Sequence, residues 1–234
     1  MNNISVIIGA RAGSKRVKEK NTRLLNGKPL ISYTIELAQK LDDISNIFVS
    51  SNDPKVEDIC SNYKTVTFIQ RPEEISGEVS KDIEYINHIL NDYDIDIFVK
   101  LNPTSPFREA SFVQENLSKF LSEGIYDSAR AVSLCKEHPG KMWTINSENE
   151  LTPLKLDIDF EYEMHEAQYQ DLPTIYTQTS SLEIADVKKV QQYGNRSGKK
   201  IMPIVCRGVN SFSIDYEHEF QIAEKYLNGE IDLI

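Results

Sequence analysis

The sequence contains little cysteine and no long apolar run, and these absences argue against several classes of protein. Among 234 residues, Cys60, Cys135 and Cys206 stand far apart and form no Cys-x-x-Cys pair. Their odd number and wide spacing disfavour a disulfide framework or a zinc site and favour a reducing cytoplasm. No apolar run approaches the ~20 residues of a membrane-spanning helix, and the first residues lack the features of a signal peptide. We therefore expect a cytoplasmic protein with no membrane partner.

Positive charge is scarce outside one segment, and the two common nucleotide fingerprints are missing. The formal net charge is −10, and no basic stripe extends beyond residues 11–20, which disfavours nucleic acid as a partner. The glycines match neither the Walker A loop nor the pattern Gly-x-Gly-x-x-Gly. A phosphate site in this chain must therefore use another geometry.

The chain does have a cluster of five cations directly after a predicted strand. Residues 4–8 are short, β-branched and apolar, as in a buried strand. In the basic loop that follows, residues 9–21, two glycines and a serine let backbone N–H groups turn toward an anion. The cations are Arg11, Lys15, Arg16, Lys18 and Lys20. Such a run is usually a solvated surface, but open α/β sheets bind ligands at the carboxyl ends of their strands, which favours a polyphosphate site.

Strand and helix patterns alternate along the chain, which predicts an α/β fold with a mainly parallel sheet and helices on both faces. The predicted strands are 4–8, 46–51, 65–69, 96–101, 128–134, 175–178 and 201–205. The predicted helices are 30–39, 53–62, 80–90, 110–123, 186–193 and 217–227. Pro203 makes the last strand an edge candidate. The alternation breaks at about residues 138–170, which we interpret as an arm inserted into a single domain (1–234) and packing on a partner.

Three further polar segments fall at predicted strand ends, and each has a structural alternative. Residues 50–53 can hold a base or ribose, although Asp53 before Pro54 also fits a plain helix cap. Residues 101–108 contain two stiffening prolines and several polar side chains, and the alternative is a rigid turn without a ligand. In residues 211–220, Asp215 and Glu219 can share a metal ion, or can cap and begin the last helix.

Taken together, these segments resemble the acylneuraminate cytidylyltransferases, the CMP-sialic acid synthetases. Residues 7–21 resemble the family's signature, and residues 101–108 are similar to its Leu-Gln-Pro-Thr-Ser-Pro-Leu-Arg loop. Residues 50–54 and 214–224 match weaker motifs, and the matches are collinear over nearly the whole chain. The resemblance implies a Rossmann-like nucleotidyltransferase fold and transfer of CMP from CTP to the anomeric hydroxyl of a 2-keto sugar acid, with release of pyrophosphate. It also implies Mg²⁺ and a homodimer built through the arm.

The resemblance assigns a role to each matching residue. Arg11 and Lys20 are the expected catalytic residues, holding the triphosphate and stabilising charge on the α-phosphorus. The expected nucleotide-binding residues are Ala10, Gly13, Ser14, Lys15, Asn21 and Arg71. The expected sugar-binding residues are Asn102, Thr104, Ser105, Arg108 and Gln170. The expected metal ligand is Asp215.

The chain departs from the family pattern mainly at the positions that the resemblance assigns to sugar binding. Ser213 replaces one of two metal carboxylates, although Mg²⁺ can be held by one carboxylate together with phosphates and water. Asn102 replaces a glutamine, Tyr169 replaces an arginine, and residues 179–181 replace Asn-Gly-Ala. These changes predict that the nucleotide is CTP and leave open a sugar other than N-acetylneuraminic acid, such as legionaminic or pseudaminic acid.

Two other functions stay open at this point. One is an enzyme of the same fold that activates 3-deoxy-manno-octulosonate or a sugar phosphate, which a substrate panel would reveal. The other is a catalytically weak nucleotide-binding protein, which Ser213 motivates. Binding of CTP and Mg²⁺ without turnover on any acid would identify the second.

Overall fold

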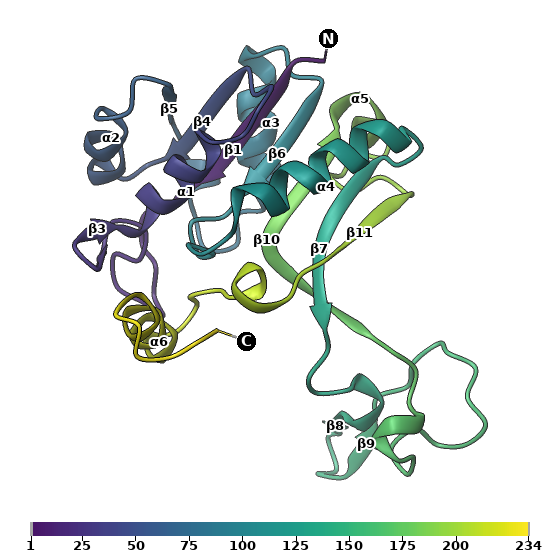
Figure 1. The fold of residues 1–234 in the computed structure, drawn as a ribbon. Helices are drawn as coiled ribbons and strands as arrows, with labels where there is room; N and C mark the ends of the chain where they lie inside the picture. The colour runs from purple at the N-terminus through teal and green to yellow at the C-terminus, as the bar shows by residue number, and fades with distance from the viewer. Residues whose placement is uncertain (1, 234) are drawn as a thin grey trace.

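The computed structural model of the chain describes residues 2–233 and centres on a seven-stranded sheet (Figure 1). Its strands are β1 (Ile4–Gly9), β4 (Asn46–Ser51), β5 (Val66–Gln70), β6 (Ile97–Leu101), β7 (Ser128–Leu134), β10 (Tyr176–Asp186) and β11 (Ile201–Val205). Their order across the sheet is β11-β7-β10-β6-β1-β4-β5. All neighbouring pairs are parallel except those of β10, which runs antiparallel to both β6 and β7. The prediction of a mainly parallel sheet is confirmed.

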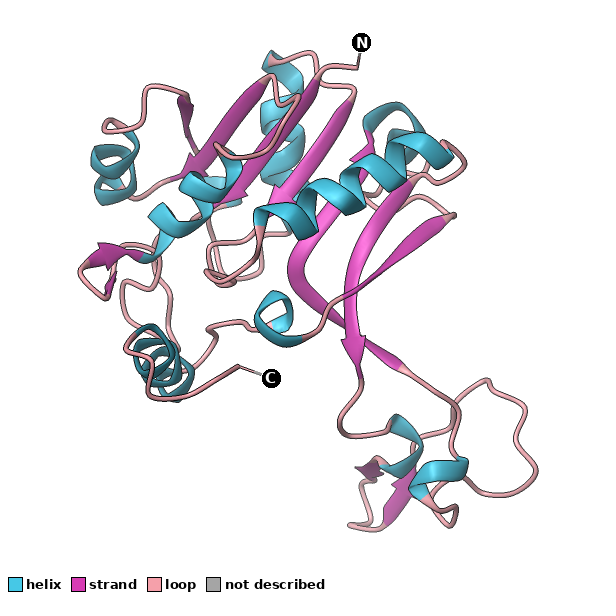
Figure 2. Ribbon diagram, in the orientation of Figure 1, coloured by secondary structure: helices cyan, strands magenta, loops and turns pink. Residues whose placement is uncertain are grey.

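Helices cover both faces of the sheet, as predicted (Figures 1 and 2). They are α1 (Leu30–Ala38), α2 (Pro54–Cys60), α3 (Asp82–Asp92), α4 (Ala110–Glu123), α5 (Val187–Gln191) and α6 (Glu217–Leu227). Val6 and Ile8 of β1 pack with α1, α2 and α4, whereas Ile7 packs with α3 and α5. Alternate residues of one strand therefore fill two separate cores, because successive strand side chains point to opposite faces.

The last part of the sheet differs from the prediction in one respect. The expected strand 175–178 continues to Asp186 as β10, so the expected helix 186–193 shrinks to α5. The pairing of β10 with β7 shifts register between Gln178 and Glu183, and this irregular, polar stretch hides the strand pattern. Pro203 does lie on an edge strand, where its missing N–H costs no sheet hydrogen bond.

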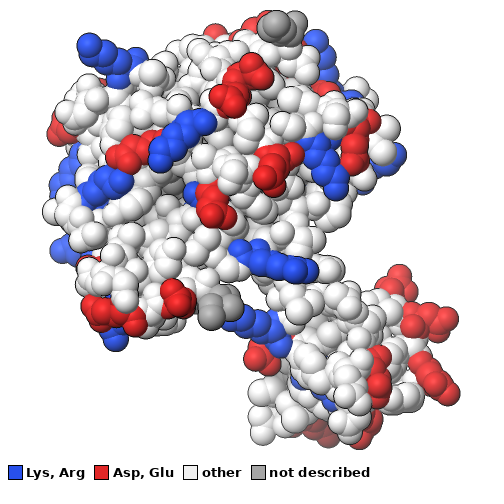
Figure 3. Space-filling model, viewed as in Figure 1, with Lys and Arg blue, Asp and Glu red and all other residues white. Residues whose placement is uncertain are grey.

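Residues 135–175 form an arm that projects from the ends of β7 and β10 (Figure 1). It contains the hairpin β8 (Trp143–Ile145) and β9 (Leu151–Pro153) and the short 3-10 helices η2 (Pro139–Lys141) and η3 (Tyr169–Asp171). Figure 3 shows it as a separate lobe with acidic side chains gathered on its outer side. The predicted arm is therefore present and longer than expected, while its contact with a partner stays a prediction.

Smaller elements complete the chain near the carboxyl ends of the parallel strands. The hairpin β2 (Leu24–Leu25) and β3 (Lys28–Pro29) precedes α1, and η1 (Glu73–Ile75) and η4 (Gly208–Ser211) lie in loops. Helix α6 packs through Phe220 and Ala223 against Leu25 and Leu30. Within residues 2–233, no helix is both long and apolar enough to cross a membrane.

Candidate functional site

A pocket of about 310 Å³ opens where the basic loop leaves β1. The loop contributes Arg11, Ser14, Lys15, Arg16, Val17 and Lys20, and the opposite side carries Glu78 and Asp215. Four of the five cations predicted to gather at this strand end therefore line one pocket. The remaining one, Lys18, is exposed. The pocket offers concentrated positive charge together with a carboxylate, which suits a polyphosphate bound with a divalent cation.

The end of β4 holds the basic loop in shape. The Ala10 amide donates to the Ser50 carbonyl at 3.0 Å, and the Ser51 hydroxyl donates to the Ala10 carbonyl at 2.6 Å. The Asn52 side chain accepts from the Ala12 amide at 2.8 Å. Residues 50–52, expected to hold a base or ribose, thus support the loop in this structure. Asp53 accepts from the Lys55 amide at 3.0 Å and caps α2, as its alternative reading proposed.

Two of the expected nucleotide-binding residues also shape the loop from within. Gly13 has φ +76°, a left-handed conformation that any side chain would strain, and it is exposed beside the pocket. The Asn21 amide donates to the Arg11 carbonyl at 3.2 Å, so Asn21 closes the end of the loop onto its beginning. Its predicted reach toward a cytidine stays a prediction.

Lys20 and Asp215 form an ion pair in the pocket wall. The Lys20 ammonium lies 3.2 Å from Asp215 Oδ1 and donates to the Ile214 carbonyl at 3.0 Å. The Ser213 hydroxyl donates to Asp215 Oδ2 at 3.0 Å. Glu219 accepts from the Asp215 amide at 2.6 Å and from the Tyr216 amide, so Glu219 caps α6 and is not free to share a metal. Asp215 is consequently oriented by its neighbours while its side chain stays 44% exposed.

The donor set around Asp215 fits a magnesium ion held largely by its substrate. In the described part of the chain, no three His, Cys, Asp or Glu residues are grouped to hold a metal ion. One exposed carboxylate beside a cationic pocket is the arrangement in which Mg²⁺ keeps several waters and takes its other ligands from phosphates. The hydroxyl of Ser213, where the family resemblance leads us to expect a second carboxylate, donates to Asp215 Oδ2.

Arg71 lies buried behind the end of β1. Its guanidinium donates to the Ser50 hydroxyl and carbonyl at 3.1 and 2.8 Å and stacks 4.2 Å from the Tyr85 ring centroid. Burial lowers the pKa of Arg71 and raises that of the Tyr85 hydroxyl well above its ordinary value. A Cβ on Gly9 would lie 2.7 Å from Tyr85 Cζ, so only glycine lets this ring approach β1. Sequence reasoning found Arg71 but missed Tyr85, which reads as an ordinary residue of an amphipathic helix.

The loop 102–108 corrects one expectation. Arg108 was expected at the lip of this loop, but it is buried, and its guanidinium donates to the carbonyls of Ser181 and Asn102 and to the Thr34 hydroxyl. Burial lowers the pKa of Arg108 to about 9, so it is still protonated at neutral pH. The Thr104 carbonyl accepts from the Ile214 amide at 2.7 Å. Arg108 therefore fixes the loop, and the loop fixes the segment that carries Asp215.

Other expected sugar-binding groups lie nearby or on the arm. The hydroxyls of Thr104 and Ser105 are buried and have no hydrogen-bond partner among the described residues, so they can serve a ligand or a water molecule. Asn102 is half-buried in the same loop. Gln170 is exposed on η3 of the arm, which Figure 1 shows well apart from β1 and α6. One chain alone does not bring Gln170 to this pocket.

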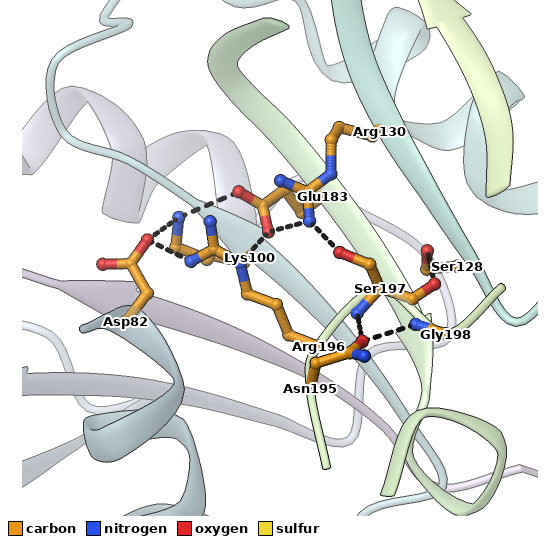
Figure 4. A network of polar contacts seen from close by, with 9 residues as sticks. All are labelled: Asp82, Lys100, Ser128, Arg130, Glu183, Asn195, Arg196, Ser197 and Gly198. Carbon is orange, nitrogen blue, oxygen red and sulfur yellow. Dashed lines mark hydrogen bonds and ion pairs between the residues drawn. The ribbon is translucent and has the colours of Figure 1, made fainter. Parts of the chain in front are cut away.

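A charged cluster on the α3 face escaped the sequence analysis (Figure 4). Glu183 of β10 stands directly between Lys100 of β6 and Arg130 of β7. Lys100 and Arg196 reach Asp82 at the start of α3 at 2.7 and 2.5 Å. Burial opposes ionisation of Asp82, but these two cations outweigh it and lower its pKa. In the sequence, this cluster is indicated by a lysine and a glutamate that stand within otherwise apolar strands.

Solved structures of nucleotidyltransferases share the fold of this chain. The chain superposes with a TM-score of 0.70 and 13% identity on CMP:2-keto-3-deoxy-manno-octonic acid synthetase complexed with CTP, over 98% of this chain and 100% of that one. It also superposes on 4-diphosphocytidyl-2C-methyl-D-erythritol synthase from Anaerococcus prevotii, with a TM-score of 0.62 and 14% identity over 97% and 96% of the two chains. At these identities the likeness concerns the fold.

Sequence similarity then gives the family. Residues 5–230 match the model of the family described as cytidylyltransferase, and the chain belongs to that family. It is 29% identical to CMP-N,N'-diacetyllegionaminic acid synthase of Legionella pneumophila over 96% of both chains. It is 37% identical to N-acylneuraminate cytidylyltransferase of Escherichia coli over 48% of this chain, a match that spans 27% of that relative's length. The predicted resemblance to CMP-sialic acid synthetases is confirmed.

Proposed function

We propose that the protein transfers CMP from CTP to the anomeric hydroxyl of a 2-keto sugar acid and releases pyrophosphate. The observation that carries this proposal is the pocket at the end of β1, where four cations face Asp215. Membership of the cytidylyltransferase family and the names of the relatives support the same reaction. The rest of the proposal follows from what each group in the pocket can do.

The cations of the pocket carry the phosphate chemistry. Arg11 and Lys20 neutralise the triphosphate and stabilise the charge that grows on the α-phosphoryl group, because transfer of this kind depends mainly on positioning and electrostatics. Lys15 pairs with Glu78 at 2.5 Å across the pocket, and both side chains are more than half exposed. Lys15 can therefore exchange that partner for a phosphate at little cost. Ser14 and the amides of the loop complete the anion site.

Asp215 is the residue that would hold Mg²⁺. The ion, when bound, would neutralise charge on the triphosphate and on the leaving pyrophosphate. Three hydrogen bonds keep this carboxylate in one orientation. The Lys20 ammonium and the Ser213 hydroxyl donate to its oxygens, and the backbone amide of Asp215 donates to Glu219. Orienting the carboxylate in advance lowers the ordering cost when the nucleotide and its ion arrive.

The nucleoside and the sugar acid occupy opposite sides of this phosphate site. Arg71 and Tyr85 form the buried wall behind Gly9 on the nucleoside side. On the sugar side, the unpartnered hydroxyls of Thr104 and Ser105 are the groups in loop 102–108 that can bond the sugar acid. The sugar hydroxyl needs a position in line with the departing pyrophosphate, and this loop is fixed to Asp215 through the Ile214 amide.

We further propose a cytoplasmic homodimer whose arms pack on one another's cores. The arm exposes Trp143, Ile145 and Leu151, residues that are 43%, 69% and 64% exposed. Large exposed apolar groups of this kind mark interaction surfaces. A partner's arm would bring the partner's copy of Gln170 to the sugar side, where this chain's own Gln170 does not reach.

The test is pyrophosphate release with CTP, Mg²⁺ and a panel of 2-keto sugar acids. We expect release only when all three are present. Absence of CTP-dependent pyrophosphate with every acid, while calorimetry still shows CTP binding, would refute transferase activity and support a nucleotide-binding protein. If 3-deoxy-manno-octulosonate is the single acid of the panel that is turned over, the protein is instead an enzyme of the same fold that activates this shorter acid.

A further inference from the structure

A cleft of about 710 Å³ lies next to the segment that carries Asp215. Its walls come from the end of β7, from the end of β11 with η4, from the first half of α6 and from the last described residues of the chain. We call it the β7–β11 cleft. It is lined by residues 133–136, 206–208, 211–213, 218–219, 222 and 232–233. Figure 3 shows positively charged side chains in this region, where the arm meets the main body.

Two residues in the wall of the cleft contact Asp215 directly. Ser213 lines the cleft, and its hydroxyl donates to Asp215 Oδ2 at 3.0 Å. Glu219 also lines the cleft and accepts from the Asp215 amide at 2.6 Å. Asp215 itself lines the triphosphate pocket. The β7–β11 cleft and the triphosphate pocket therefore meet at the bonded pair Ser213 and Asp215.

Hydrogen bonds also tie the cleft to loop 102–108, the proposed sugar side of the site. In η4, the Asn210 side chain accepts from the Glu109 amide, just after this loop, at 2.9 Å. The Ile214 amide donates to the Thr104 carbonyl within the loop at 2.7 Å. The segment that forms one wall of the cleft is thus held against the sugar-side loop from η4 to Asp215.

The cleft presents two cations whose side chains have no partner. Arg207 lines it from the end of β11 and Lys136 from the end of β7, and both are exposed. The Lys136 carbonyl accepts from the Tyr169 hydroxyl, and the Arg207 carbonyl accepts from the Asn210 amide. Among residues 2–233, these backbone bonds are their polar contacts, and neither charged group is paired. Both can therefore bind an anion without giving up an existing bond.

The other charged groups of the region are already bonded or solvated. Glu219 accepts from the amides at the start of α6. Asp232 is exposed near the end of the chain, where solvent screens its charge. Lys141 of the arm donates to the carbonyls of His165 and Ala167. An anion that enters the cleft would consequently find its partners in the two cations at the ends of β7 and β11.

We propose that Arg207 and Lys136 bind the carboxylate of the sugar acid and so hold its anomeric hydroxyl beside the α-phosphoryl group. This inference rests on the proposed function. In the ring form of a 2-keto sugar acid, the carboxylate and the anomeric hydroxyl are attached to the same carbon. The carboxylate must therefore bind next to the metal and the triphosphate, which is where Ser213 and Asp215 place the cleft. A guanidinium matches a carboxylate with two parallel hydrogen bonds, and the lysine adds a point charge.

The test compares the sugar acid that the wild type turns over best with the methyl ester of the same acid, used as a competing ligand. We expect Arg207→Gln to raise the KM for the acid by about tenfold or more, because hydrogen bonds between charged groups are the strong ones. The inhibition constant of the ester and the KM for CTP should stay unchanged. Arg207→Lys should restore part of the loss, and Lys136→Gln should raise the KM for the acid severalfold.

Lys119→Gln is the matched control, because Lys119 is exposed on α4, does not line the cleft and carries the same charge. We expect wild-type kinetics from it. Calorimetry with CTP and Mg²⁺ should give wild-type affinity for both Arg207 variants, which shows that they fold. An unchanged KM for the acid in Arg207→Gln would overturn the inference, as would an equal loss of affinity for the acid and its ester. Absence of pyrophosphate release by the wild type with every acid would instead refute the proposed function.

Discussion

Replacing Lys20 by methionine should remove most of the activity while leaving the fold nearly intact. The ammonium contacts Asp215 at 3.2 Å and the Ile214 carbonyl at 3.0 Å, and only 15% of its side chain is exposed. Asp215 is 44% exposed, so the ion pair is screened by solvent and contributes about 0–1 kcal/mol to stability. The hydrogen bond adds about 1 kcal/mol. We expect Tm to fall by roughly 2–8 °C, at about 2–4 °C per kcal/mol for a chain of this size.

The expected effect on catalysis is much larger. A preorganised group aimed at charge that develops in the transition state contributes about 10²–10³ in kcat. The assay is steady-state pyrophosphate release at saturating CTP, with the melting temperature measured on the same sample. Lys18→Met is the matched control, because Lys18 is exposed in the same loop and does not line the pocket. A Lys20→Met protein with wild-type kcat, or one whose CTP KM alone rises, would refute a role for Lys20 in the transition state.

Three more predictions follow from the structure. Arg71→Met should raise the KM for CTP by about tenfold or more, measured by titrating CTP, since a buried charged hydrogen bond contributes about 1.5–3 kcal/mol; an unchanged KM would place the nucleoside elsewhere. The pKa of Asp82 is lowered in the fold from 3.8, so its contribution to stability is present above pH 3.8 and is lost as pH falls through the lowered value. Acid denaturation should therefore show the stability gap between wild type and Asp82→Asn closing below that pH, and a gap independent of pH would contradict the ion pairs. Trp143→Asp should convert a dimer to a monomer in sedimentation at micromolar concentration, and a wild type already monomeric would contradict the proposed assembly.

Periodicity was enough to predict most of the fold. Alternating short apolar strands and amphipathic helices indicated a parallel sheet covered on both faces, and the sheet has that form. The part of a strand that escaped is the second half of β10, residues 179–186, because the shifted pairing between Gln178 and Glu183 interrupts the alternation that marks a strand. The rule that ligands bind at the carboxyl ends of parallel strands predicted a site beside the basic loop, and a pocket lined by four of its cations lies there.

Side-chain burial could not be predicted in the same way. Arg108 lies in a polar, proline-rich loop that suggested exposure, and its burial depends on the carbonyl of Ser181, which is 73 residues away in the chain. Lys100 and Glu183 are 83 residues apart and compensate one another across two strands. Each charge alone looks unfavourable in a strand, and only the strand order reveals the partner. The charged cluster around Glu183 follows from that order and not from any local motif.

The central claim is tested most directly by identifying the product by mass spectrometry. The protein should be incubated with CTP, Mg²⁺ and a mixture of 2-keto sugar acids, beside reactions that lack either CTP or the acids. We predict a CMP-sugar whose mass equals one acid plus CMP minus water, formed together with pyrophosphate and absent from both control reactions. Consumption of CTP without a CMP-sugar, or no change in CTP with any acid, would contradict the account.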